Sequence, residues 1–199
     1  MLGLPQSTQL NKQLPKKAIF AAFGLNAQKK DSFDKDVSKI FIINEISPAT
    51  VNIAAGEKVN SIFVLRVLLK DKQFSEKIVA SISKLIPQNM VMVLEHEAQA
   101  KLAVYYSKLY QTNWQPTDSL TLQLTGLDFD TVWDNIIKTI SGVESDSTTS
   151  LDESLAKKEH KERILKEIKL LEKQAWNEKQ PKKKFELVQK INKLKEEAL

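Results

Sequence analysis

Residues Val59–Lys70 read V-N-S-I-F-V-L-R-V-L-L-K, a long run of apolar and β-branched side chains. Arg66 is the one charged side chain between Ile62 and Leu69. A continuous apolar run of this kind is typical of a central β-strand that is buried on both faces. We therefore expect a β-sheet with this segment at its centre.

The segments on either side of this run alternate between helix-like and strand-like patterns. Residues 4–14 are expected to form an extended arm, because Pro5 precedes a mostly polar stretch. Helix start and stop signals predict helices at Pro15–Phe23, Ala27–Ser38, Ser75–Ile86 and Asp128–Gly142. Strand-like composition or alternation predicts further strands at Lys39–Ile46, Thr50–Ile53, Met90–Leu94, Lys101–Tyr110 and Leu120–Leu124. The predicted fold class is α+β, and residues 1–142 are expected to form a mixed β-sheet flanked by helices, with a basic N-terminal arm.

Residues 143–154 have a different composition. Acidic side chains stand among serines and threonines there, and Val143 and Leu151 are the apolar exceptions. Such a segment cannot bury enough apolar surface to offset the entropy of ordering it. We therefore interpret residues 143–154 as an acidic Ser/Thr-rich linker that separates the first domain from residues 155–199.

Two apolar stripes with the same spacing follow the linker. They are Ile164, Ile168, Leu171 and Ala175 in the first, and Leu187, Ile191, Leu194 and Ala198 in the second. Pro181 stands between them and breaks a continuous helix. Folding the chain back at residues 177–181 brings Leu171 level with Ile191, as an antiparallel coiled-coil seam requires. Residues 155–199 are therefore predicted to form an antiparallel helical hairpin, with helices at about 155–176 and 182–198.

Composition restricts the possible chemistry and location. The chain has no cysteine, so disulfides, thiolate nucleophiles and cysteine-ligated metal sites are excluded. No apolar run approaches the roughly 20 residues that cross a bilayer. The first nine residues lack the charged start and apolar core of a secretory signal. A cytoplasmic location without membrane association is the expectation.

The net charge of +5 is unevenly distributed along the chain. Residues 1–30 carry +5, residues 31–150 carry −4 and residues 151–199 carry +4. Basic ends on an acidic body indicate an acidic or polyanionic partner. The alternative is that these lysines only keep exposed helices in solution.

Eight residues at the two basic ends are candidates for binding a partner or a nucleic acid. They are Lys12, Lys16, Lys17, Trp176, Lys179, Lys182, Lys183 and Lys184. Lysines beside an aromatic ring can contact a phosphate backbone while the ring stacks on a base. The alternative is that Trp176 covers the end of the hairpin seam while the lysines face water.

No catalytic residue, metal site or cofactor is predicted. Glu95-His96-Glu97 is the one carboxylate–imidazole cluster, but neighbours on a strand point to opposite faces of the sheet. The five glycines are scattered singly, so no phosphate-binding glycine loop is present. The element order invites comparison with restriction-type nucleases, whose metal site needs an acid on one strand and an E-x-K pair on the next. The Val59–Lys70 run has no acid, so an enzyme site around Glu45, Arg66, Glu95 and His96 is kept only as an alternative.

Three segments together carry a family resemblance. They are L-P-Q-S-T-Q-L-N-K-Q-L-P-K (Leu4–Lys16), I-S-P-A-T-V-N (Ile46–Asn52) and E-K-Q-A-W-N-E-K-Q-P-K-K-K-F-E-L (Glu172–Leu187). With them, nearly the whole chain resembles the prokaryotic family DUF4391, a domain of unknown function. The positions that match are Lys12, Pro15, Lys16, Gln174, Lys184 and Glu186, whereas Trp176 and Pro181 depart from the usual residues. The resemblance implies a companion of helicase and DNA-methyltransferase genes in restriction-like loci.

Three functional hypotheses follow from these observations. The first is a non-enzymatic accessory subunit of a DNA-defence system that binds a larger protein of the helicase or methyltransferase type. The second is a basic protein that binds nucleic acid directly through its N-terminal arm and hairpin tip. The third is a degenerate or unrecognised nuclease-like enzyme.

Overall fold

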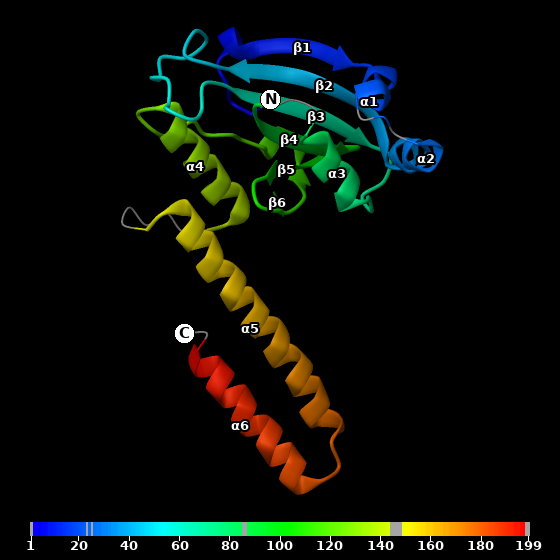
Figure 1. The fold of residues 1–199 in the computed structure, drawn as a ribbon, viewed down its shortest axis with the longest axis vertical. Coiled ribbons are helices and arrows are strands. Elements are labelled where there is room, and N and C mark those ends of the chain that lie inside the picture. Colours follow the sequence, from blue (N-terminus) through cyan, green and yellow to red (C-terminus); the bar gives the residue numbers. More distant parts are fainter. Residues whose placement is uncertain (1, 23, 25, 85–86, 144–148, 198–199) are drawn as a thin grey trace. The chain divides into compact units, whose positions relative to one another are not determined.

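In the computed structural model, residues 2–22, 24, 26–84, 87–143 and 149–197 are described. The chain divides into two compact units, Met1–Ser145 and Asp146–Leu199, which are called the body and the hairpin unit below (Figure 1). No helix in the described ranges is long and apolar enough to span a membrane.

The body is built on one mixed β-sheet with the strand order β1-β2-β3-β4-β5-β6. The strands are β1 (Gln9–Leu14), β2 (Val37–Ile46), β3 (Ile62–Leu69), β4 (Asn89–His96), β5 (Gln99–Tyr105) and β6 (Leu109–Gln111), and β7 (Gln115–Pro116) also pairs with β5. Strands β3 and β4 are parallel, and every other pair in this order is antiparallel. The predicted α+β class with a mixed sheet is confirmed, and the apolar run at Val59–Lys70 supplies the central strand β3.

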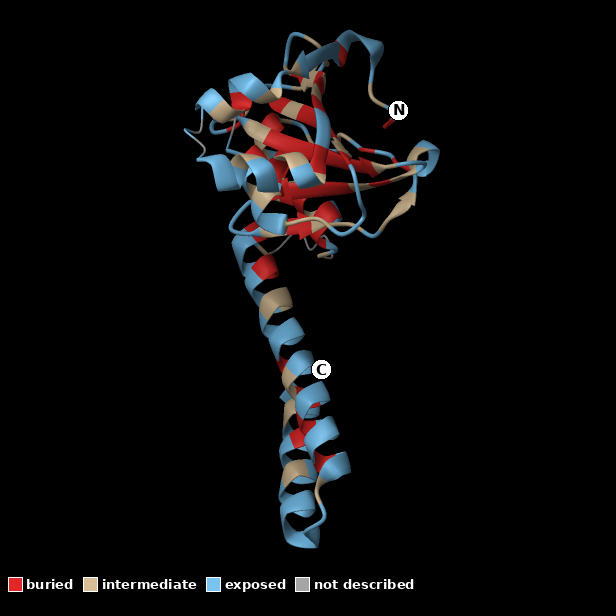
Figure 2. Cartoon of the chain, turned by 90° about the vertical axis from the view of Figure 1, so that its right-hand side faces the viewer, coloured by how far each residue is buried: buried red, intermediate tan, exposed pale blue. Residues whose placement is uncertain are grey.

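Three short helices cover one face of the sheet, namely α1 (Lys16–Ala22), α2 (Ala27–Asp36) and α3 (Glu76–Ile82). Their apolar residues, such as Ile19, Phe33 and Ile82, pack with Leu65 and Met92 in one core. Helix α3 lies between β3 and β4 in the sequence, so it forms the crossover that parallel strands need. The central strands β3, β4 and β5 are largely buried (Figure 2), whereas the edge strand β1 is exposed.

The fourth helix of the body, α4 (Phe129–Ser141), contacts β5 and β6. The Asp128 side chain accepts the backbone N–H of Thr131 at 2.8 Å, and Gly142 ends the helix in the left-handed conformation at φ 67°. The carboxylate of Asp130 accepts the backbone N–H groups of Glu57, Lys58 and Val59 at 2.8, 3.1 and 2.7 Å. The loop before β3 is therefore fastened to the first turn of α4.

Two predicted helices end too late: α2 ends at Asp36 rather than Ser38, and α3 ends at Ile82, while Leu85 and Ile86 lie outside the described residues. Four further sequence predictions for the body are wrong in detail. Residues 9–14 of the predicted arm form the edge strand β1, whose polar side chains hid it. Residues 50–53 form no strand, because the Thr50 hydroxyl closes a turn on Ser47 and Glu45. The predicted strand Lys101–Tyr110 is two strands, β5 and β6, joined by a tight turn. Leu120 and Leu122 are buried as their alternation predicts, but the segment makes only an isolated bridge from Thr121 to Leu2.

The hairpin unit contains α5 (Leu151–Asn177) and α6 (Pro181–Glu197), which run in opposite directions (Figure 1). The predicted start at residue 155 is four residues late, because Ser150 and Glu153 form a reciprocal capping box that begins α5 at Leu151. Residues 144–148 of the predicted linker and Ala198 of the predicted seam lie outside the described residues. The other seven seam residues pack in one cluster: Ile164, Ile168, Leu171, Ala175, Leu187, Ile191 and Leu194.

Candidate functional site

Ion pairs between the two helices of the hairpin define two sides of its seam. Glu172 pairs with Lys195 at 2.9 Å, and Glu167 pairs with Lys190 at 2.8 Å. Glu172 directly follows the seam residue Leu171, so it points about 100° away from the seam. Glu167 directly precedes the seam residue Ile168 and points the opposite way. The two pairs therefore lie on opposite sides of the seam.

The exposed apolar residues near the turn of the hairpin lie on the Glu172–Lys195 side. Residues three, four or seven positions apart share a face of a helix. Trp176 is four residues after Glu172, Val188 is seven before Lys195, and Phe185 is three before Val188. We call this side, with Trp176, Phe185 and Val188, the aromatic side of the hairpin.

The aromatic side leaves large apolar surfaces in water. Trp176 is 85% exposed, Phe185 62% and Val188 40%. The sequence left open whether Trp176 covers the end of the seam, and the structure shows that it does not. Ala175, the residue before it, fills the last seam position of α5 and is 6% exposed. Exposed aromatic residues of this size are typical of binding surfaces rather than of helix surfaces in general.

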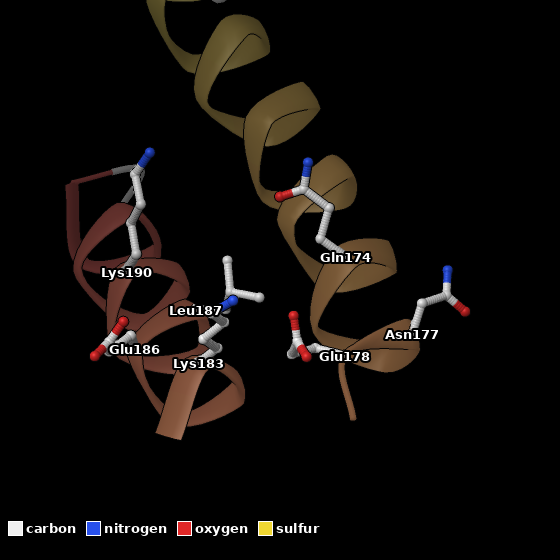
Figure 3. A pocket seen from close by; sticks show the side chains of 7 residues that line it. All are labelled: Gln174, Asn177, Glu178, Lys183, Glu186, Leu187 and Lys190. Carbon is white, nitrogen blue, oxygen red and sulfur yellow. The ribbon is translucent and has the colours of Figure 1, made fainter. Parts of the chain in front are cut away.

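The opposite side of the seam carries a shallow groove near the turn (Figure 3). The groove has a volume of about 680 Å³ and is lined by Gln174, Asn177, Glu178, Lys183, Glu186, Leu187 and Lys190. Leu187 supplies an apolar floor, while two lysines and two glutamates offset each other. Lys190 is already paired with Glu167. This groove is therefore polar without a dominant charge, and we call it the polar groove.

Positive charge is concentrated in the half of the hairpin near the turn. Residues 167–195, which run from Glu167 around the turn to Lys195 at about the same level, have nine basic and four acidic side chains, whereas residues 151–166 and 196–197 have five basic and six acidic ones. The predicted tip residues come together here: Trp176 lies in the last turn of α5, Lys179 in the connecting loop, and Lys182, Lys183 and Lys184 at the start of α6. No acidic residue accompanies these three lysines in the first helical turn. Positive charges at a helix N-terminus oppose the helix dipole, so they do not serve the stability of α6.

A family model described as "Domain of unknown function (DUF4391)" matches residues 2–197 of the 199-residue chain. The chain belongs to the DUF4391 family. The resemblance that the sequence motifs indicated is thereby confirmed, and it covers both the body and the hairpin unit. Comparisons with curated proteins and with solved structures found no match to the chain.

The three N-terminal candidates of this DUF4391 chain, Lys12, Lys16 and Lys17, lie in the body and have different surroundings. Lys12 lies on the edge strand β1 and Lys17 is exposed on α1. Lys16 donates to Asp34 and to the backbone carbonyl of Val37, both at 2.6 Å. Its charge therefore ties α1 to the end of α2, which is a structural role that the sequence did not indicate.

Two of the four residues of the alternative enzyme site, Arg66 and Glu95, form an ion pair in the structure, and Glu45 lies on β2. Arg66 on β3 donates two hydrogen bonds to Glu95 on β4, at 2.7 and 2.6 Å. These bonds raise the pKa of Arg66 above its ordinary value, although partial burial works against the rise. His96 follows Glu95 on the strand, and its Nδ1 atom is buried without a hydrogen-bond partner. Among the described residues, no group of three or more His, Asp or Glu side chains could hold a metal ion.

One arrangement in the body has no signal in the sequence. The Lys101 ammonium lies 4.7 Å from the ring centre of Phe74 and 4.9 Å from that of Trp114. Burial lowers the pKa of Lys101, and the nearby Glu76 carboxylate partly opposes this. The three residues are far apart in the chain and meet only through the fold. This cation–π contact joins β5 to the segment before α3 and to the segment after β6, on the face of the sheet that α3 covers.

Proposed function

We propose that this DUF4391 protein is a non-enzymatic accessory subunit that binds a larger protein through its hairpin. The observation that supports this most directly is the exposure of Trp176, at 85%, beside Phe185 and Val188 on one side of the seam. A buried aromatic side chain removes about 150–250 Å² from water, and each Å² of apolar surface contributes about 25 cal/mol. Folding of the hairpin buries little of the Trp176 side chain and gains little of this free energy, whereas a partner that covers the side chain gains most of it.

The family resemblance supports the kind of partner. DUF4391 proteins resemble companions of helicase and DNA-methyltransferase genes in restriction-like loci. We therefore propose a partner of the helicase or methyltransferase type, and a role in prokaryotic DNA defence.

Co-purification from the native host tests this proposal. The tagged full-length protein is expected to recover a large nucleic-acid enzyme that mass spectrometry identifies. Ile168→Asp places a charge in the seam and is expected to abolish recovery. Leu170→Ala is the matched control, because Leu170 lies on the same helix outside the seam and is 57% exposed. Recovery of the wild-type protein alone and monomeric would contradict the proposal.

Direct binding of nucleic acid is the second candidate, and the excess of five positive charges in residues 167–195 favours it. An interface that neutralises several phosphates weakens steeply between about 50 and about 200 mM salt. A gel-shift assay with single- and double-stranded DNA at these two salt concentrations is the test. The triple variant Lys182→Glu, Lys183→Glu and Lys184→Glu is expected to remove any shift. Absence of a shift at the lower salt concentration would rule this candidate out.

A further inference from the structure

We infer that the aromatic side of the hairpin binds one acidic, amphipathic helix of the partner, which lies along α5 and α6 as the third helix of a bundle. This inference rests on the proposed function and names the surface and the chemistry of the segment that it binds.

The first argument is the spacing of residues on α5. The seam residues Ile164, Ile168, Leu171 and Ala175 are four, three and four positions apart. Each is followed directly by a residue of the aromatic side, so Leu165, Lys169, Glu172 and Trp176 repeat the same spacing one position later. All four of these residues are exposed. The apolar members of this set, Leu165 and Trp176, stand at its two ends, so α5 presents an exposed stripe of about three turns with an apolar side chain at each end.

Helix α6 presents a matching stripe on the same side. Phe185, Val188 and Lys195 are three and seven positions apart and exposed, and Lys195 pairs with Glu172 of α5 across the seam. The two stripes therefore flank one shallow surface between the helices. Its apolar part, formed by Trp176, Phe185 and Val188, lies toward the turn, and the Glu172–Lys195 pair follows it. Leu165 continues the stripe on α5, 45% exposed. Residues 165–176 extend over roughly 16 Å, a length that a partner helix of about three turns covers.

The second argument is charge. Three lysines lie on or beside the aromatic side: Lys169 belongs to its stripe on α5, Lys173 lies three residues before Trp176, and Lys182 lies three residues before Phe185. Glu172, the acidic residue of the stripe, is already paired with Lys195. A second copy of this chain would bring the same excess of positive charge against it, so self-association through this side is disfavoured. A helix with aspartates and glutamates beside its apolar stripe meets lysines instead. Single-stranded nucleic acid would satisfy the lysines, but Val188 and Leu165 offer no ring on which a base can stack.

The test uses the full-length protein and three labelled probes. The first is a synthetic helical peptide of three heptads with leucine at its seam positions and glutamate beside them. The second is the same peptide with lysine in place of glutamate, and the third is a single-stranded oligothymidylate. Fluorescence anisotropy at moderate salt measures the Kd of each probe for the wild-type protein, for Trp176→Ala and for Leu170→Ala. Leu170 is the matched control, because Gln174 and Asn177 of the polar groove lie four and seven residues after it.

The glutamate peptide is expected to bind, and Trp176→Ala is expected to weaken it at least tenfold while Leu170→Ala leaves its Kd within twofold. The lysine peptide is expected not to bind. Four results would overturn the inference: no binding of the glutamate peptide, equally tight binding of the lysine peptide, equal effects of the two variants, or tighter Trp176-dependent binding of the oligothymidylate. If the native partner is still recovered and is lost only on Ile168→Asp, the proposed function stands while the aromatic side is not its surface.

Discussion

The body and the hairpin unit of this chain bury their apolar side chains in different ways. In the body, β3 and β4 bury residues on both faces of the sheet, such as Val64 and Leu65 in succession. In the hairpin, α5 and α6 share one seam of seven described residues. The tryptophans show the contrast most clearly, because Trp133 of α4 is 7% exposed and Trp176 of α5 is 85% exposed. The fold accounts for the first tryptophan, and it leaves the second available to a partner.

The largest expected effect compares these two tryptophans. Trp133→Ala opens a cavity in the body and is expected to lower the free energy of unfolding by about 3–5 kcal/mol. Trp176→Ala removes a side chain in water, so its expected effect is within about 0.5 kcal/mol. Urea denaturation followed by circular dichroism measures both. Similar losses for the two variants would mean that Trp176 supports the fold, and the proposed binding role would lose its basis.

A seam substitution tests whether the two units are stable independently. Leu171 is 7% exposed in the seam, so Leu171→Ala is expected to cost about 2–5 kcal/mol and to unfold the hairpin. The body, with its own core, is expected to stay folded. Circular dichroism should show lost helix, and limited proteolysis should show a new cleavage site after residue 155. Leu170→Ala is the control and should leave both readings unchanged. Loss of the body together with the hairpin would contradict the division into two units.

A polar contact in the body is expected to have a smaller effect. Asp130→Ala leaves three backbone N–H groups of the loop before β3 without their acceptor. The expected loss of stability is about 0.5–1.5 kcal/mol, because the N–H groups of Glu57 and Lys58 are exposed and can bond water instead, while that of Val59 is partly buried. Hydrogen exchange should accelerate at residues 57–59 and remain unchanged in α5. Asp118→Ala, at an exposed aspartate, is the control. Unchanged exchange at residues 57–59 would show that the loop is held by other contacts.

Sequence patterns predicted those parts of the fold in which periodicity and burial agree. The seam of the hairpin and the ends of α4 at Asp128 and Gly142 were predictable, because each has a pattern that few other structures share. The edge strand β1 was not, since its exposed polar residues resemble a loop and only pairing with β2 makes it a strand. Leu120 and Leu122 show the reverse case, in which alternation predicts burial but not a paired strand.

The candidate site was predictable to a similar extent. The lysines near the turn are a matter of composition, whereas the sequence left open whether Trp176 covers the end of the seam, and only the structure shows that it is exposed. The Lys16–Asp34 pair and the contact of Lys101 with Phe74 and Trp114 could not be predicted. They join residues that only the tertiary fold brings together, and no local pattern marks such pairs.

The smallest expected effect on stability separates folding from binding in the hairpin itself. Lys182 lies in the first turn of α6, where a positive charge opposes the helix dipole and an acidic residue would favour it. Lys182→Glu is therefore expected to stabilise the hairpin by about 0.3–1 kcal/mol, read as a higher Tm of its helical signal. The same change removes one positive charge near the aromatic side and adds a negative one, so binding of the glutamate peptide should weaken. Lys193→Glu is the control, because it makes the same change of charge in the interior of α6, away from the N-terminus where the helix dipole acts. The control is therefore not expected to show this gain in Tm. If Lys182→Glu instead lowers Tm, the lysines of the turn stabilise the hairpin, and their cluster needs no partner to explain it.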